Sequence, residues 1–163
     1  MLIVCTKDKT IRGWAENGDS NASEWGKVHL LSPGNNKSKA TQELEALIAQ
    51  LGDTEALCIH AHGNDDEIGD EGSGDDDWGW TYKALANIFK SKKPGYKGNI
   101  LFRSCGEGVD NFSSRLRVEL EGLKALKGTW IYGQNRSQDI KRPYPKPEKL
   151  DKDVTLQAAE VKY

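Results

Sequence analysis

Short apolar segments alternate with amphipathic segments along this chain, and that alternation constrains the fold more than any other feature. Compact apolar runs that are typical of strands occur at 2–6, 27–31, 56–60, 100–102 and 129–132. Between the later runs, apolar residues recur at helical spacing over 38–51, 80–89 and 112–123, as in helices that bury one face. Strands separated by helices predict an α/β domain. We expect a three-layer αβα sandwich in which helices cover both faces of a mainly parallel sheet.

The two remaining parts of the chain do not follow this alternation. Residues 7–26 are polar and rich in Gly, Asn and Ser, so we interpret them as a long turn or hairpin region. The C-terminal part contains Pro143, Pro145 and Pro147, which favour an extended backbone. We therefore divide the chain into an α/β domain, residues 1–133, and an extended segment, residues 134–163, that ends as an edge strand near 154–156 or as a tail.

Composition and cysteine usage favour a cytoplasmic protein. No stretch approaches the roughly 20 apolar residues that span a bilayer, so we expect no membrane partner. The apolar run Leu2–Cys5 is too short for a signal peptide and has no basic flank. Three cysteines, Cys5, Cys58 and Cys105, are an odd number, which indicates reduced thiols rather than a disulfide framework. Cys5 and Cys58 lie within apolar runs, where they act as small buried side chains.

The segment 65–77 carries eight carboxylates and no basic residue, although the whole chain has a net charge of only −2. We weigh three interpretations of this acidic loop. It could be a solvated, mobile insertion, a site that selects Lys or Arg side chains, or a Ca²⁺ site, although the DxDxDG spacing of a calcium loop is absent. Its charge argues against contact with nucleic acid phosphates.

Histidine and cysteine follow two neighbouring strands of the predicted sheet. The run at 56–60 continues into His62 and Gly63, and the run at 100–102 continues toward Cys105. Because parallel strands end at the same rim of a sheet, we expect the two side chains to lie close together. A Cys/His pair supports thiol nucleophile chemistry, in which imidazole assists thiolate formation and protonates the leaving amine. Zinc bound by His60, His62 and Cys105 lacks a fourth ligand and CxxC spacing, so we predict no metal site.

These two segments resemble the caspase-like superfamily of cysteine peptidases, which includes caspases, metacaspases, gingipains, clostripain, separase and CHAT-domain proteases. The matching residues are 56–63 (ALCIHAHG) and 99–106 (NILFRSCG). The resemblance covers about residues 56–132, and it implies a caspase-like fold, related in topology to flavodoxin. It also implies that His62 is the catalytic histidine and Cys105 the nucleophile. The backbone N–H groups of Gly63 and Cys105 would then form the oxyanion hole.

The resulting hypothesis is a cysteine endopeptidase that acts on a peptide or protein substrate. The acidic loop predicts cleavage after a basic residue, with Asp75, Asp76 or Asp77 contacting the basic side chain. We interpret His60 as a core or supporting histidine, because the Gly that follows His62 selects His62 for catalysis. One alternative is a catalytically inactive caspase-like module for binding or regulation. Another is a flavodoxin-like ligand-binding domain, although no phosphate-cradling glycine motif follows any strand.

Overall fold

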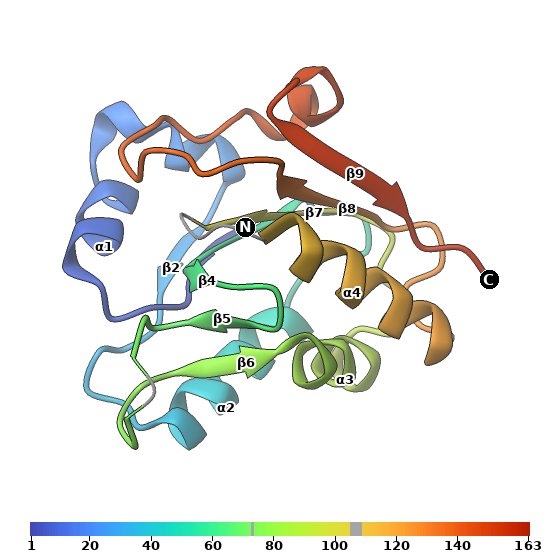
Figure 1. Ribbon diagram of the computed structural model, residues 1–163, viewed down its shortest axis with the longest axis horizontal. Coiled ribbons are helices and arrows are strands. Elements are labelled where there is room, and N and C mark those ends of the chain that lie inside the picture. The colour runs from blue at the N-terminus through green and yellow to red at the C-terminus, as the bar shows by residue number, and fades with distance from the viewer. Residues whose placement is uncertain (73, 105–108) are drawn as a thin grey trace.

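A computed structural model gives the arrangement of the elements (Figure 1). It describes residues 1–72, 74–104 and 109–163, with the main chain only for 109–111. A central sheet has the strand order β2-β1-β3-β7-β8-β9. Its strands are β1 (Leu2–Val4), β2 (Val28–Leu30), β3 (Leu57–His60), β7 (Asn99–Arg103), β8 (Trp130–Gln134) and β9 (Leu156–Glu160). All neighbouring pairs are parallel except β8 and β9. The predicted α/β class and mainly parallel sheet are therefore confirmed.

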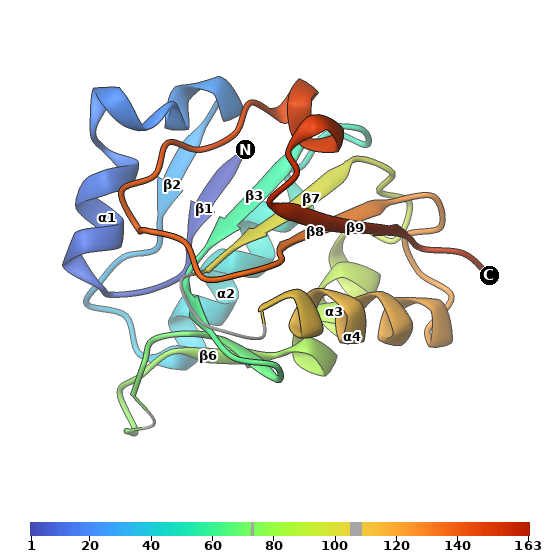
Figure 2. The same ribbon diagram turned by 45° about the horizontal axis from the view of Figure 1, so that its top comes forward.

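Two layers of side chains separate the sheet from its covering segments. Alternate strand residues such as Ile3, Ile59 and Phe102 belong to one core cluster, which α2 (Lys37–Ala49), α3 (Tyr82–Lys92) and α4 (Val109–Gly122) cover. The residues between them, such as Leu2, Cys58 and Leu101, belong to a second cluster on the other face. Period-two alternation along each strand produces this division. Figure 2 shows the sheet between the two sets of covering segments.

The second face is covered by the N-terminal region and by the C-terminal segment. Residues 7–26 form α1 (Lys9–Ala15) and two 3-10 turns, Gly18–Ser20 and Ala22–Trp25, so the interpretation of a turn or hairpin is wrong. The C-terminal segment continues through the 3-10 helix η3 (Pro147–Lys152) into β9. Indole N–H groups of Trp14 and Trp25 donate to the carbonyls of Arg142 (3.0 Å) and Pro145 (3.0 Å). These bonds join the two covering segments.

A small antiparallel sheet follows β3 directly. It consists of β4 (His62–Gly63), β5 (Glu67–Gly69) and β6 (Gly79–Thr81), in that order. The acidic loop therefore includes a strand, which the charge pattern conceals, and the following helix begins at Tyr82 rather than at 80. Trp78 and Trp80 are buried beneath this sheet. No helix in the described part of the chain is long and apolar enough to cross a membrane.

Candidate functional site

The carboxyl ends of β3 and β7 lie side by side at one rim of the central sheet. His60, the last residue of β3, is in register with Arg103, the last residue of β7. Beyond that pair, the Ala61 N–H donates to the Arg103 carbonyl (3.1 Å). The Ser104 N–H donates to the side-chain oxygen of Gln134 (3.0 Å), which stands at the end of β8. Three parallel strands thus fix the backbone up to Ser104.

Gly63 packs directly against Ser104. A Cβ atom added to Gly63 would lie 3.1 Å from Ser104 Oγ and 3.2 Å from a methyl carbon of Ile68. These distances are shorter than ordinary contacts, so glycine permits the close approach of β4 to the end of β7. Ser104 itself is 1% exposed. His62 and Gly63 therefore lie beside the residue that precedes Cys105 in the sequence. Cys105 and its neighbours at 106–108 lie outside the described residues.

The carboxylate of Asp8 contacts the Nε2 side of the His62 ring. Its carboxylate oxygen Oδ2 lies 2.8 Å from His62 Nε2, and its Oδ1 accepts the N–H groups of Thr10 (2.8 Å) and Ile11 (3.1 Å) as the N-cap of α1. Although partial burial alone would raise the pKa of Asp8, hydrogen bonds from His62 and these two backbone groups lower it below its ordinary value. An ionised carboxylate fixed by a helix N-terminus is thus available to orient the imidazole.

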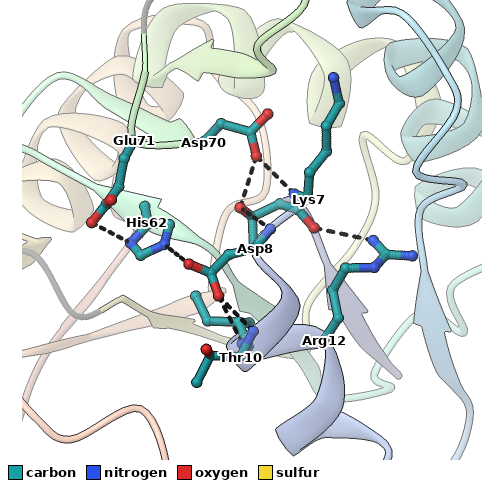
Figure 3. Close-up of polar contacts among 9 residues, drawn as sticks. Lys7, Asp8, Thr10, Arg12, His62, Asp70 and Glu71 are labelled. Carbon is teal, nitrogen blue, oxygen red and sulfur yellow. Dashed lines mark hydrogen bonds and ion pairs between the residues drawn. The ribbon is translucent and has the colours of Figure 1, made fainter.

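The second nitrogen of His62 faces the acidic loop. His62 Nδ1 lies 3.4 Å from Glu71 Oε1, so the ring stands between two carboxylates (Figure 3). The two carboxylates differ in exposure, since the Glu71 side chain is 77% exposed and that of Asp8 is 28% exposed. Asp8 is therefore part of the fixed structure. Glu71, by contrast, is accessible to a group that approaches from solvent.

Asp70 connects the segment that carries Asp8 to the segment that carries Glu71. Its Oδ1 accepts the Thr6 hydroxyl (2.8 Å) and the Lys7 N–H (2.7 Å), and its Oδ2 accepts the Trp78 N–H (2.8 Å). These bonds, partly shown in Figure 3, join the end of β1 to both arms of the acidic loop. Because one hydroxyl and two backbone N–H groups from two separate segments donate to it, Asp70 is a structural residue that positions the carboxylates on either side of His62.

The residues Asp75 and Asp76 are exposed near the tip of the acidic loop, and Asp77 accepts the Gly74 N–H (2.9 Å). Among the described residues of the acidic loop, Glu71 contacts His62, and charge counting alone does not distinguish it from its neighbours. Lys7 Nζ donates to the carbonyl of Asp76, so a cation from outside the loop partly offsets its charge. No group of three or more His, Cys, Asp or Glu residues within the described ranges is arranged to hold a metal ion.

His60 lies in a separate, buried environment. It is 1% exposed, and its Nδ1 lies 2.6 Å from the Tyr144 hydroxyl. Burial, together with electrostatic interactions with Arg103 and His62, lowers the pKa of His60 well below its ordinary value, against a smaller opposing effect of Asp8. His60 is therefore neutral at physiological pH and supports the rim from inside.

Arg103 is buried inside the rim, in register with His60, and it has no carboxylate partner among the described residues. It is 4% exposed, and its guanidinium donates to the carbonyls of Ile140 (3.3 Å) and Arg142. Its central carbon lies 4.4 Å from the centre of the Tyr144 ring, an arrangement that stabilises a buried cation. Burial lowers its pKa. The C-terminal segment is thus attached to the residues next to the candidate site.

The buried thiols are poor nucleophiles. Cys5 and Cys58 are both free and fully buried. Burial raises the pKa of Cys58 to about 12 and also raises that of Cys5. Since the thiolate is the reactive form, neither competes with an accessible cysteine for an electrophile.

Sequence reasoning missed Asp8 and Glu71. Asp8 carries one usable signal, because Asp followed by Thr10 and the apolar Ile11 is typical of a helix N-cap. That signal predicts a capping role and gives no indication of His62. Comparison of the chain with protein-family models finds no match, and comparison with curated proteins finds no significant similarity.

Proposed function

We propose that this protein is a cysteine peptidase of caspase-like fold, in which Cys105 is the nucleophile and His62 the general acid and base. The observation that carries the proposal is the contact between Gly63 and Ser104, with a Cβ distance of 3.1 Å. It sets His62 beside the strand end from which the chain continues to Cys105. A backbone N–H at Gly63 or Cys105 could stabilise the oxyanion formed when the thiolate attacks a carbonyl carbon.

Asp8 acts in this proposal as a positioning residue. A thiol nucleophile needs a base whose ring is itself oriented by a third group. Asp8 meets this requirement, because it bonds His62 Nε2 at 2.8 Å and leaves Nδ1 on the side of the exposed Glu71. Nδ1 is then the nitrogen that takes the thiol proton and later delivers it to the leaving amine.

We further propose that the preferred substrate carries a basic residue before the cleaved bond. The carboxylate of Glu71 stands next to His62 and is largely exposed, and Asp75, Asp76 and Asp77 extend the negative charge along the same loop. A basic side chain would pair with Glu71 and withdraw it from Nδ1. Binding of such a substrate would thereby remove the Glu71 carboxylate from the ring nitrogen that the chemistry uses.

Labelling of the folded protein with iodoacetamide, followed by peptide mass spectrometry, tests the nucleophile. We expect Cys105 to be labelled in preference to the buried Cys5 and Cys58. His62→Ala should slow labelling by a basic peptidyl acyloxymethyl ketone by roughly 10²-fold or more, as expected for loss of general acid and base assistance. Equal reactivity of Cys105 in both proteins would contradict the proposal and favour a binding or regulatory module.

Asp8→Asn separates positioning from folding. Asn caps a helix about as well as Asp, so the melting temperature should stay close to that of the unmodified protein. The rate of labelling by the ketone should nevertheless fall, by up to about 10⁴-fold, since the ring loses its ionised partner.

For substrate preference, Glu71→Gln should reduce the selection of Arg and Lys from a peptide library more than the matched Asp75→Asn. Unchanged selection in Glu71→Gln would reject that assignment.

A further inference from the structure

A groove lies on the second face of the sheet, between η3 and the strands β7, β8 and β9. It has a volume of about 650 Å³, and its lining includes Trp130, Tyr132, Leu150, Glu148 and Asp151. Asn99 and Trp130 open β7 and β8, whereas His62 lies beyond the opposite ends of the strands. Five residues of β7 span about 17 Å, so the groove is separate from the candidate peptidase site. Figure 2 shows η3 as the red coil beside β9.

The floor of the groove is aromatic. Trp130 and Tyr132 are two residues apart on β8 and therefore face the same side of the sheet. Trp130 is 41% exposed, which is unusual for the largest apolar side chain. An exposed indole face offers a surface on which a cation or a planar group can stack.

The wall of the groove is acidic. In a 3-10 helix, residues three apart lie on the same face, so Glu148 and Asp151 project together while Lys149 and Lys152 lie on the next face. Both carboxylates are on exposed residues, and neither forms an ion pair or a side-chain hydrogen bond with any residue in the described ranges. Two unpaired carboxylates beside an indole are complementary to a guanidinium ion, which is planar and can be held by two acceptors at once.

The Tyr132 hydroxyl is a third unpartnered group. Tyr132 is 6% exposed, it lines the groove, and its hydroxyl makes no hydrogen bond to another described residue. Burial, with a smaller contribution from the charge of Asp151, raises the pKa of Tyr132, which is consistent with Asp151 facing it across the groove. Since the hydroxyl is not fully enclosed by protein, it is accessible to a ligand in the groove.

We propose that this groove binds an arginine side chain of a peptide, with the guanidinium stacked on Trp130 and paired with Glu148 and Asp151. A volume of about 650 Å³ is larger than one side chain needs and leaves room for the flanking peptide backbone. The site does not depend on the peptidase activity proposed above, because none of its residues belongs to the rim that carries His62.

Titration of ¹⁵N-labelled protein with acetyl-Gly-Arg-Gly-amide tests the proposal. We expect the indole N–H resonance of Trp130 to shift in a saturable way, with a dissociation constant on the order of millimolar, typical of so few contacts. The same peptide with citrulline in place of arginine keeps the shape and loses the charge, and it should bind at least fivefold more weakly. Equal binding of the two peptides, or no shift at Trp130, would overturn the proposal.

Variants of the wall complete the experiment. Glu148→Gln combined with Asp151→Asn should weaken binding of the arginine peptide at least fivefold, whereas Glu24→Gln, a charge change at an exposed residue outside the groove lining, should not. All three positions are exposed, so the variants should fold. Shifts confined to residues near His62 would assign the peptide to the rim and reject the groove, while leaving the proposed function intact.

Discussion

The hydrogen bond between His60 and Tyr144 links the end of β3 to the C-terminal segment, and Tyr144→Phe removes only this bond. The hydroxyl lies 2.6 Å from His60 Nδ1. The two rings pack edge to face with centroids 5.4 Å apart, and Arg103 stacks on the Tyr144 ring. Phenylalanine keeps the ring and both packing contacts. The substitution therefore isolates the polar contribution.

The expected cost follows from the burial of both partners. His60 and Tyr144 are each 1% exposed, so water cannot replace the lost hydroxyl. A buried polar group left without its partner costs about 1–3 kcal/mol of unfolding free energy. For a domain of this size, 1 kcal/mol corresponds to about 2–4 °C in melting temperature. At about 2 kcal/mol, the midpoint of the range, Tyr144→Phe should lower the melting temperature by about 4–8 °C.

Thermal unfolding followed by circular dichroism at pH 7.5 measures this effect. Tyr132→Phe is the matched control, because the Tyr132 hydroxyl has no hydrogen-bond partner in the described part of the molecule. We expect the melting temperature of this variant to stay within about 1 °C of that of the unmodified protein, as for a substitution that removes no bond. Equal shifts in the two variants, or no shift in Tyr144→Phe, would refute the reasoning that His60 is a structural histidine.

Three further predictions concern stability. Burial lowers the pKa of His60, so as the pH falls the unfolded chain binds a proton at this residue before the folded protein does. The stability that neutral His60 contributes is therefore present above about pH 6.5 and is lost at up to about 1.4 kcal/mol per pH unit below it. The free energy of urea unfolding of His60→Gln should show a flatter pH dependence. Gly69 has φ of +147°, and an added Cβ would lie 2.3 Å from the Trp78 carbonyl, so Gly69→Ala should cost about 2 kcal/mol in urea unfolding, whereas Gly95→Ala, with no atom within 4 Å, should not. Asp70→Ala leaves three donors without their acceptor and should cost about 2 kcal/mol or more, with faster hydrogen exchange of the two amide protons it binds; unchanged exchange would contradict its structural role.

The parallel sheet could be predicted because its strands are buried on both faces. Such strands are short continuous apolar runs, as at Leu57–His60 and Asn99–Arg103, and they stand out from their polar surroundings.

α1 was missed for the opposite reason. It has seven residues and buries only Ile11 and Ala15, too few to establish a helical period. Its stability comes from the Asp8 cap and from packing against the C-terminal segment, which the local sequence does not contain.

The partner of His62 depends on strand register, which explains why the sequence did not reveal it. Val4 is in register with His60, so the chain leaving β1 runs alongside the chain leaving β3. Asp8 and His62 meet four and two residues beyond that pair. They are 54 positions apart in the sequence, and only the pairing of β1 with β3 brings them together. His62 could be proposed as a candidate catalytic residue from local sequence, but the carboxylate that contacts it could not.

The carboxylates of the acidic loop have different partners and different roles. Asp70 and Glu71 are adjacent, yet Asp70 turns toward the Thr6 hydroxyl and the Lys7 N–H, while Glu71 turns toward His62. Asp66 is paired with Arg115 of α4. Several carboxylates are therefore occupied by structural bonds, and the charge that acts on His62 comes from Asp8 and Glu71. Under the proposed function, a substrate cation at this rim would meet Glu71 as the exposed carboxylate beside the imidazole among the described loop residues. The substitution of Glu71 alone is therefore the variant that tests the proposed specificity.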